Sequence, residues 1–221
     1  MKDNSCNKNL STKSQSSLNA INTKNLKTGS KLVTSEMNIP TEQECILLME
    51  EHNLADNMKR HSVLVSKMAD ALGKALIASG EEINLSLLHA SALLHDLDKK
   101  ITLNDGKSHG YVSEKILIEK GFPEVAKIVR KHRLETVSED KEGLFTWEEK
   151  LVYYADKRAN DDKTVSLDER YEYLVWRYGA TEEKKNKILS TKPAIEKLEK
   201  EIFSRLKIKP EELKQLILTG E

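Results

Sequence analysis

Apolar residues recur at intervals of three and four along much of the chain, and this spacing limits the possible folds more than any other feature. The clearest run is Val63, Leu64, Met68, Leu72 and Leu76, whose side chains would share one face of a helix. No stretch shows the sustained alternation of apolar and polar residues that is typical of a half-buried strand. Aromatic residues make up only 5% of the chain, which argues against a β-sandwich. The sequence therefore predicts an all-α fold.

Capping residues, glycines and prolines mark where the helices are expected to begin and end. Capping boxes are visible at Thr41 with Glu44, Thr146 with Glu149, and Ser166 with Glu169. Residues 99–107 are expected to form a loop. The first expected helix follows Thr41, and the second runs from about His61 to Ser79. Further helices are expected at 85–97, 109–120, 124–132, 151–160, 167–178 and 181–206, the last with a bend near Pro193. A short helix is expected to begin at Pro210.

The chain divides by composition into three parts. Residues 1–38 are rich in Asn, Ser, Thr and Lys and have no apolar periodicity, so we expect a disordered polar tail. A transit peptide is the alternative, because this segment is Ser-rich and acid-poor, although it contains no arginine. Residues 39–178 are expected to form the main helical domain, and residues 179–221 a C-terminal helical extension.

Charge and hydropathy exclude several classes of protein. Charged residues make up 33% of the chain and balance to a formal net charge of zero, so no global basic field would attract nucleic acid or an anionic membrane. The apolar runs are too short to span a bilayer, and no apolar segment typical of a secretion signal follows the start. Cys6 and Cys45 are too few for a disulfide framework and fit a reducing compartment. We expect a cytoplasmic protein.

Histidines and aspartates gather at the edges of the apolar, helix-period segments. A protein has little reason to direct several imidazoles and two carboxylates from separate helices toward its core unless they hold metal ions. Mixed nitrogen and oxygen ligation suits Mn, Fe, Co, Ni or Zn better than Ca. We therefore expect one or two divalent transition-metal ions per chain, held by His61, His95, Asp96, His109, His132 and Asp156.

The order of these residues resembles a known family, the HD-domain metal-dependent phosphohydrolases. Their pattern of a histidine, a His-Asp doublet and a final aspartate on separate helices is matched here by His61, His95-Asp96 and Asp156. The surrounding segments Arg60-His61-Ser62, residues 92–99 and residues 154–158 match as well. The resemblance spans about Thr41 to Tyr178 and implies an HD-type helical bundle in which the four residues hold a first metal.

Family members that bind two metals add two histidines between the doublet and the last aspartate, and His109 and His132 occupy those places. In this respect the chain is similar to bacterial HD-type dinucleoside tetraphosphate hydrolases. It departs from them in residues 133–135 and 157–158. A closer likeness is to HD domains found alone or fused to nucleotidyltransferase-like domains. These domains carry a similar Ala-Asp-Lys-Arg stretch followed by a Val-Ser-Leu-x-Glu-Arg pattern, which is found here at residues 165–170.

The resemblance implies a metal-dependent phosphohydrolase acting on a nucleotide or another small phosphate ester. Asp96 would bridge the two metals, and metal-bound water or hydroxide would be the nucleophile. Asp96 and Lys99 are the expected catalytic residues. Lys99 and Lys157 are the expected phosphate contacts, because each lies within three residues of an expected ligand and phosphate binding needs cations.

Other readings of the same residues stay open. The chain could be a non-catalytic HD-fold module that binds a nucleotide, or a nucleic-acid phosphodiesterase, although its neutral charge argues against nucleic acid as a partner. His109 and His132 could be ordinary helix-end histidines. His52 and His89 are interpreted as structural, with His89 alternatively helping to position a ligand. A homo-oligomer is compatible with the sequence.

Overall fold

The computed structural model describes residues 37–103, 109–138 and 143–219. The predicted tail at 1–38 therefore lies almost wholly outside the described residues, as do residues 104–107 of the loop predicted at 99–107. The described residues lie in one compact unit.

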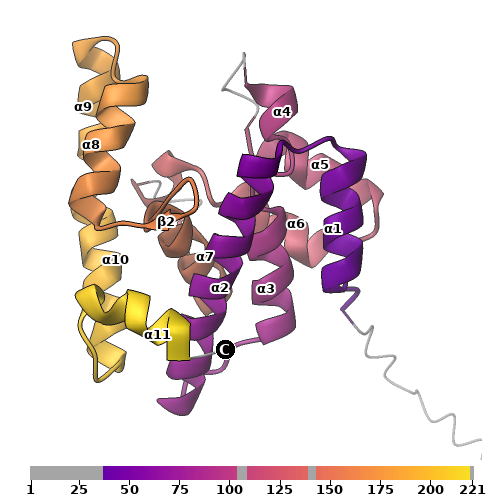
Figure 1. Ribbon diagram of the computed structural model, residues 1–221, viewed down its shortest axis with the longest axis horizontal. Coiled ribbons are helices and arrows are strands. Elements are labelled where there is room, and N and C mark those ends of the chain that lie inside the picture. The colour runs from indigo at the N-terminus through magenta and orange to yellow at the C-terminus, as the bar shows by residue number, and fades with distance from the viewer. Residues whose placement is uncertain (1–36, 104–108, 139–142, 220–221) are drawn as a thin grey trace, which may run out of the picture. The chain divides into compact units, whose positions relative to one another are not determined.

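The described chain is mostly helical, with a single two-stranded hairpin, so the all-α prediction is confirmed (Figure 1). The capping boxes at Thr41, Thr146 and Ser166 each begin a helix as expected. The elements in chain order are α1 (Glu42–Glu51), α2 (Asp56–Ala78), α3 (Leu85–Leu94), α4 (Lys99–Thr102), α5 (Tyr111–Glu119), α6 (Pro123–Arg130), η1 (Leu134–Ser138), α7 (Trp147–Lys157), β1 (Ala159–Asn160), β2 (Lys163–Thr164), α8 (Leu167–Tyr178), α9 (Glu182–Ser190), α10 (Lys192–Arg205), η2 (Pro210–Glu212) and α11 (Leu213–Thr219).

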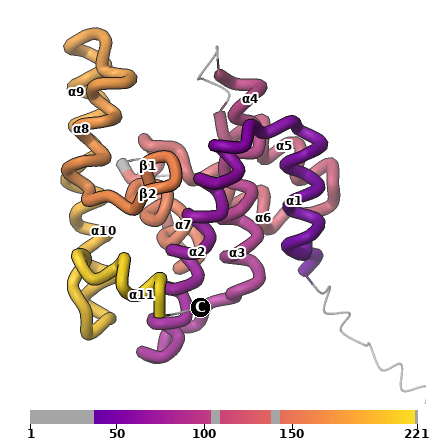
Figure 2. Tube along the Cα trace, in the orientation of Figure 1, coloured from indigo at the N-terminus to yellow at the C-terminus, as the bar shows by residue number. Residues whose placement is uncertain are grey.

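The long helix α2 is the centre of the packing. It lies against α3 and α7, which also contact each other, and α6 packs on the far side of α3 (Figure 2). Met68, Leu72 and Leu76 are fully buried on its apolar face, as the three- and four-residue spacing predicts. Gly73 lets α2 and α3 approach closely, because a Cβ there would lie 2.7 Å from Leu88 Cδ2. No helix among the described residues is long and apolar enough to cross a bilayer.

The C-terminal helices are attached to this core through α2 and α7, which α11 and α10 contact respectively. The prediction of one bent helix over 181–206 is wrong, because α9 and α10 are separate helices that meet at Thr191. Two local features explain the break. The buried Thr191 hydroxyl bonds the Ile188 carbonyl and the Tyr171 hydroxyl, and Pro193 in the first turn of α10 has no N–H to continue the preceding helix.

Helix ends near the histidines also differ from the expected ones. Helix α2 begins at Asp56, so His61 lies in its second turn rather than its first. Helix α3 ends at Leu94, and the imidazole of His95 donates to the Ala92 carbonyl that a continued helix would use for the Asp96 N–H. Helix α7 ends at Lys157 instead of reaching residue 160.

The segments next to these helix ends also differ from the predicted structure. The short helix α4 occupies the start of the predicted loop at 99–107. The pair β1–β2 follows α7 as an antiparallel hairpin, although the strands are too short to show any alternation in the sequence. The helix predicted at 109–120 is the shorter α5, which leaves His109 in the turn before it.

Candidate metal centre

Separate elements bring the six expected ligands together in the core. His61 comes from α2 and Asp156 from the last turn of α7, while the other four lie in the turns next to helix ends. Five of the six are buried and His109 is partly buried, with its side chain 20% exposed. The structure therefore places all six expected ligands in one cluster, made of His61, His95, Asp96, His109, His132 and Asp156.

Every imidazole in the cluster has its Nδ1 beside an oxygen acceptor. His61 Nδ1 lies 2.9 Å from the Asp161 carbonyl, His95 Nδ1 lies 2.7 Å from the Ala92 carbonyl, and His132 Nδ1 faces the Val129 carbonyl. His109 Nδ1 lies 2.7 Å from Asp98 Oδ1. Since carbonyl and carboxylate oxygens only accept, each Nδ1 carries a proton and donates it, and each Nε2 is the ring nitrogen directed to the centre of the cluster.

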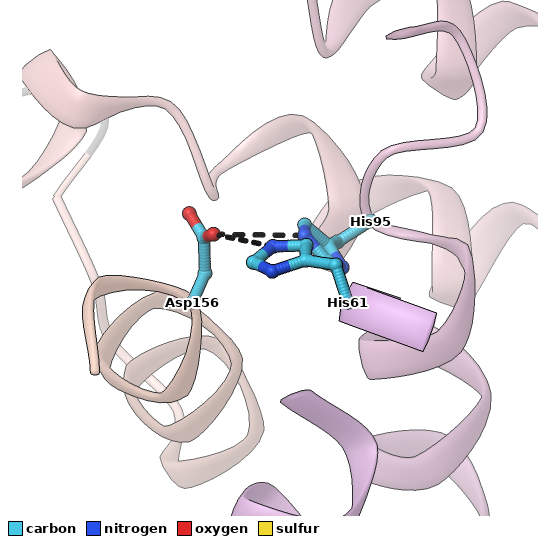
Figure 3. A group of neighbouring side chains, drawn as sticks. All are labelled: His61, His95 and Asp156. Carbon is cyan, nitrogen blue, oxygen red and sulfur yellow. Dashed lines mark hydrogen bonds and ion pairs between the residues drawn. The ribbon is translucent and has the colours of Figure 1, made fainter. Parts of the chain in front are cut away.

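The first ligand group consists of His61, His95 and Asp156, which point toward one another (Figure 3). Asp156 Oδ1 lies 3.1 Å from His61 Nε2 and 3.7 Å from His95 Nε2. Two ligand atoms that share one metal ion about 2.1 Å away are roughly 3–4 Å apart, so these spacings are those of a ligand set.

The second group consists of Asp96, His109 and His132. Asp96 Oδ1 lies 3.2 Å from His109 Nε2 and 3.5 Å from His132 Nε2, and the two Nε2 atoms are 2.8 Å apart. Two lone pairs at that distance repel each other unless a proton or a metal ion lies between them. The group therefore has the chemistry of a cation site.

Asp96 connects the two groups. Its Oδ1 faces the second group, while its Oδ2 lies 3.6 Å from His95 Nε2 in the first. His95 and His132 stand ring to ring with centroids 5.2 Å apart, so the groups are immediate neighbours. Each oxygen of this carboxylate thus faces a different group, as the sequence prediction of a bridging aspartate requires.

A family comparison agrees with this geometry. The model of the HD domain matches residues 29–161, which include all six cluster residues. The chain belongs to the HD domain family. The family resemblance inferred from the motif is therefore confirmed, and with it the superfamily of metal-dependent phosphohydrolases.

The names of the relatives of this HD domain do not identify a specific activity for it. An uncharacterized protein of Methanocaldococcus jannaschii is 32% identical over 126 residues, which cover 52% of this chain and 73% of the relative. A protein of Picrophilus torridus named tRNA (cytidine(56)-2'-O)-methyltransferase is 28% identical over 140 residues, 58% of this chain but 39% of that protein. The chain thus spans well under half of the methyltransferase. No solved structure matches the chain.

The electrostatics of the HD site fit a divalent metal. His95 Nε2 is fully buried and has no hydrogen-bond partner among the described residues, an arrangement that a metal ion would satisfy. Burial lowers the pKa of His95 to about 4, so its imidazole is neutral and able to ligate near neutral pH. Although burial raises the pKa of Asp156, the Lys157 ammonium and nearby imidazoles hold it well below its usual range. Neutral imidazole and ionised carboxylate are the forms that bind metals.

His109 differs from His95 in its charge. Burial lowers its pKa, but hydrogen bonds to Asp96 and Asp98 outweigh burial and raise it to about 9. In the absence of a metal ion, His109 therefore carries a positive charge beside Asp96 and Asp98. A metal ion bound by this group would displace that proton.

The two lysines expected to contact phosphate lie differently. Lys99 Nζ is 3.3 Å from Asp96 Oδ1 and its side chain is 32% exposed, so it can exchange this contact for one with a bound ligand. Lys157 is buried, with Nζ donating to the His132 carbonyl at 2.9 Å and to Asp156. Lys157 would have to exchange those contacts to reach a phosphate group, and its phosphate role stays a prediction.

Sequence reasoning missed three residues that shape the site. Asp98 accepts from His109, the Asp161 carbonyl accepts from His61, and Arg170 lies 3.7 Å from Asp156. Asp98 lies two residues after the His-Asp doublet. A carboxylate so close to an expected ligand in a predicted core could have been identified from the sequence as part of the site. The Asp161 contact is made by the main chain, so its side chain gave no signal. His89 pairs with Asp70 away from the cluster, and His52 ends α1.

Proposed function

We propose that this HD domain is a metal-dependent phosphohydrolase that acts on a nucleotide or another small phosphate ester. One observation carries the proposal: each of the four imidazoles has its Nδ1 committed to an oxygen acceptor, so four Nε2 atoms converge on two carboxylates. Histidines that bind metals usually donate their other ring N–H to a carboxylate or a carbonyl in this way.

In this proposal each residue of the cluster has a defined task. His61, His95, Asp96 and Asp156 would hold a first metal ion, and His109 and His132 would complete a second one with Asp96. A divalent metal held there would supply an acidified water molecule as nucleophile and neutralise charge on the phosphoryl group. The buried carboxylates stay ionised, and the partly exposed Lys99 beside Asp96 orients the substrate phosphate.

The number of ligand groups supports a hydrolytic role over mere nucleotide binding. Two adjacent cation sites with a shared carboxylate suit an in-line displacement, in which both the attacking and the leaving oxygen need stabilising. A module that only bound a nucleotide would need neither the second group nor its orienting Asp98. The metal chemistry and the position of Lys99 support a phosphate-bearing substrate, such as a nucleotide.

The experiment is a screen of phosphate release from nucleotides and simple phosphate esters by protein loaded with Mn²⁺. We expect turnover by the parent and a loss of more than about a hundredfold in Asp156→Ala, because a ligand to the metal is removed. Asp168→Ala is the matched control, since that aspartate is on α8 with its side chain 75% exposed. If the metal-loaded parent cleaves nothing yet binds a nucleotide tightly, the chain is a non-catalytic binding module instead.

A further inference from the structure

Helix α8 brings one more cation to the site from outside the segment that the HD family model matches. The match ends at residue 161, and α8 begins six residues later, after the β1–β2 hairpin (Figure 1). The Ser166 capping box fixes the start of α8, and Arg170 follows in its first turns. The hairpin and the cap thus direct this arginine back to the cluster.

The contacts of Arg170 leave much of its guanidinium unused. One terminal nitrogen lies 3.2 Å from Asn160 Oδ1, and the other lies 3.7 Å from Asp156 Oδ1, which is beyond hydrogen-bond range. Its Nε is buried with no hydrogen-bond partner among the described residues. An arginine has five N–H donors, so most of them have no acceptor among the described residues.

The position of Arg170 also differs from that of the nearby lysine. Lys157 is engaged at both the His132 carbonyl and Asp156, and its side chain is only 5% exposed. The Arg170 side chain is 13% exposed and its guanidinium lies 5.6 Å from the centre of the Tyr173 ring. The ring supports one side of the guanidinium, while the N–H edge faces the carboxylate of the ligand cluster.

We propose that Arg170 binds a phosphate oxygen of the substrate beside the first ligand group. This inference rests on the proposed phosphohydrolase function and adds to it the residue that recognises the phosphate. A planar guanidinium donates two parallel hydrogen bonds to a phosphate, which an ammonium cannot do. Helix α8 is then part of the active site although it lies outside the matched family segment.

The test measures binding of inorganic phosphate to Mn²⁺-loaded protein by calorimetry, with metal content and melting temperature recorded for each variant. We expect Arg170→Gln to weaken phosphate binding by about tenfold or more while metal content stays at the parent level. Arg170→Lys keeps the charge beside Asp156 but loses the planar donor pair, so its phosphate affinity should lie between those of the parent and Arg170→Gln. Arg177→Gln is the matched control, because that arginine is exposed on the same helix and its guanidinium lies over the Tyr178 ring.

Two results would overturn the inference. Parent-like phosphate affinity in Arg170→Gln would show that the arginine does not touch the anion. Loss of metal from both Arg170→Gln and Arg170→Lys would show that it only supports Asp156. Either result leaves the proposed function standing if the parent still releases phosphate from esters, whereas a parent that binds metal but neither binds nor cleaves any phosphate compound refutes both.

Discussion

The carboxylate of Asp98 accepts a hydrogen bond from Nδ1 of His109 at 2.7 Å, and its other oxygen accepts from the main-chain N–H groups of Gly110 and Ser113 at 2.7 and 3.1 Å. This fully buried aspartate thus holds both the start of α5 and the orientation of a metal-ligand candidate. An aspartate two residues after the His-Asp doublet thereby links the backbone fold to the second ligand group.

Asp98→Asn should reduce metal binding by the second group while the first group keeps its ion. The amide has one acceptor oxygen in place of two, so either His109 or the N–H groups of α5 lose their partner. We expect metal affinity of the second group to fall by about 10–100-fold and the free energy of unfolding to fall by about 1–3 kcal/mol.

Metal titration and urea denaturation would check both effects of Asp98→Asn. Ser113→Ala is the control, since it removes the hydroxyl that bonds the Asp98 N–H but keeps the carboxylate contacts. Equal metal binding by Asp98→Asn and the parent would show that Asp98 serves only the fold.

His109→Ala and His132→Ala should each lower the metal content of saturated protein from about two ions per chain to about one. These residues supply two of the three ligand candidates in the second group and none in the first. His61→Ala should weaken the other site instead. Metal analysis after dialysis measures the difference, and an unchanged stoichiometry in both second-group variants would reject the second metal.

The turn of the β1–β2 hairpin should matter through its backbone. Asp161 has a φ of 50°, a left-handed conformation that β-branched residues adopt poorly, and its carbonyl accepts from His61. We expect Asp161→Val to lower stability by about 1–2 kcal/mol and to weaken metal binding by the first group. Asp161→Gly keeps the conformation and should bind metal like the parent. If both variants bind metal equally well, the carbonyl does not position His61.

The His89–Asp70 pair predicts a dependence of stability on pH that is separate from the metal centre. Nδ1 of His89 lies 2.7 Å from Asp70 Oδ2, and this hydrogen bond raises the pKa of His89. The pair therefore stabilises the fold fully below the unfolded pKa of about 6.5, and this contribution is lost as pH rises through the higher folded pKa.

Asp70→Asn should accordingly lower the free energy of unfolding more near pH 5, where His89 is protonated, than near pH 8. The loss near pH 5 should be only about 1 kcal/mol, because the pair is partly exposed. Urea denaturation of parent and variant at the two pH values gives the comparison. A difference that grows toward pH 8 would have the wrong sign for this pair.

Sequence periodicity and capping were sufficient for the fold class and for most helices, because an apolar face and a capping box are local signals. The helix ends beside the histidines could not be predicted in the same way. His95 turns its imidazole back onto the Ala92 carbonyl, and Asp98 caps α5 from another segment. Both contacts depend on tertiary structure that local residue preferences do not contain.

The members of the ligand cluster were predictable because a histidine or an aspartate in an apolar setting needs a reason to be there. Residues acting through the main chain, such as Asp161, or from the helix beyond the motif, such as Arg170, left no comparable pattern. Lys157 follows Asp156 directly, and proximity in sequence did not indicate that its ammonium would be buried against the His132 carbonyl.

In the proposed metal centre Asp96 joins the two ligand groups, because its two oxygens face different groups. The most direct measurement is the metal content of protein saturated with Mn²⁺, compared between the parent and Asp96→Ala. We expect about two ions per chain in the parent, and weaker binding at both positions in the variant because each group loses an oxygen ligand. A parent that binds no metal, or an Asp96→Ala variant that retains two ions with parent affinity, would show that the cluster is not a metal centre joined by Asp96.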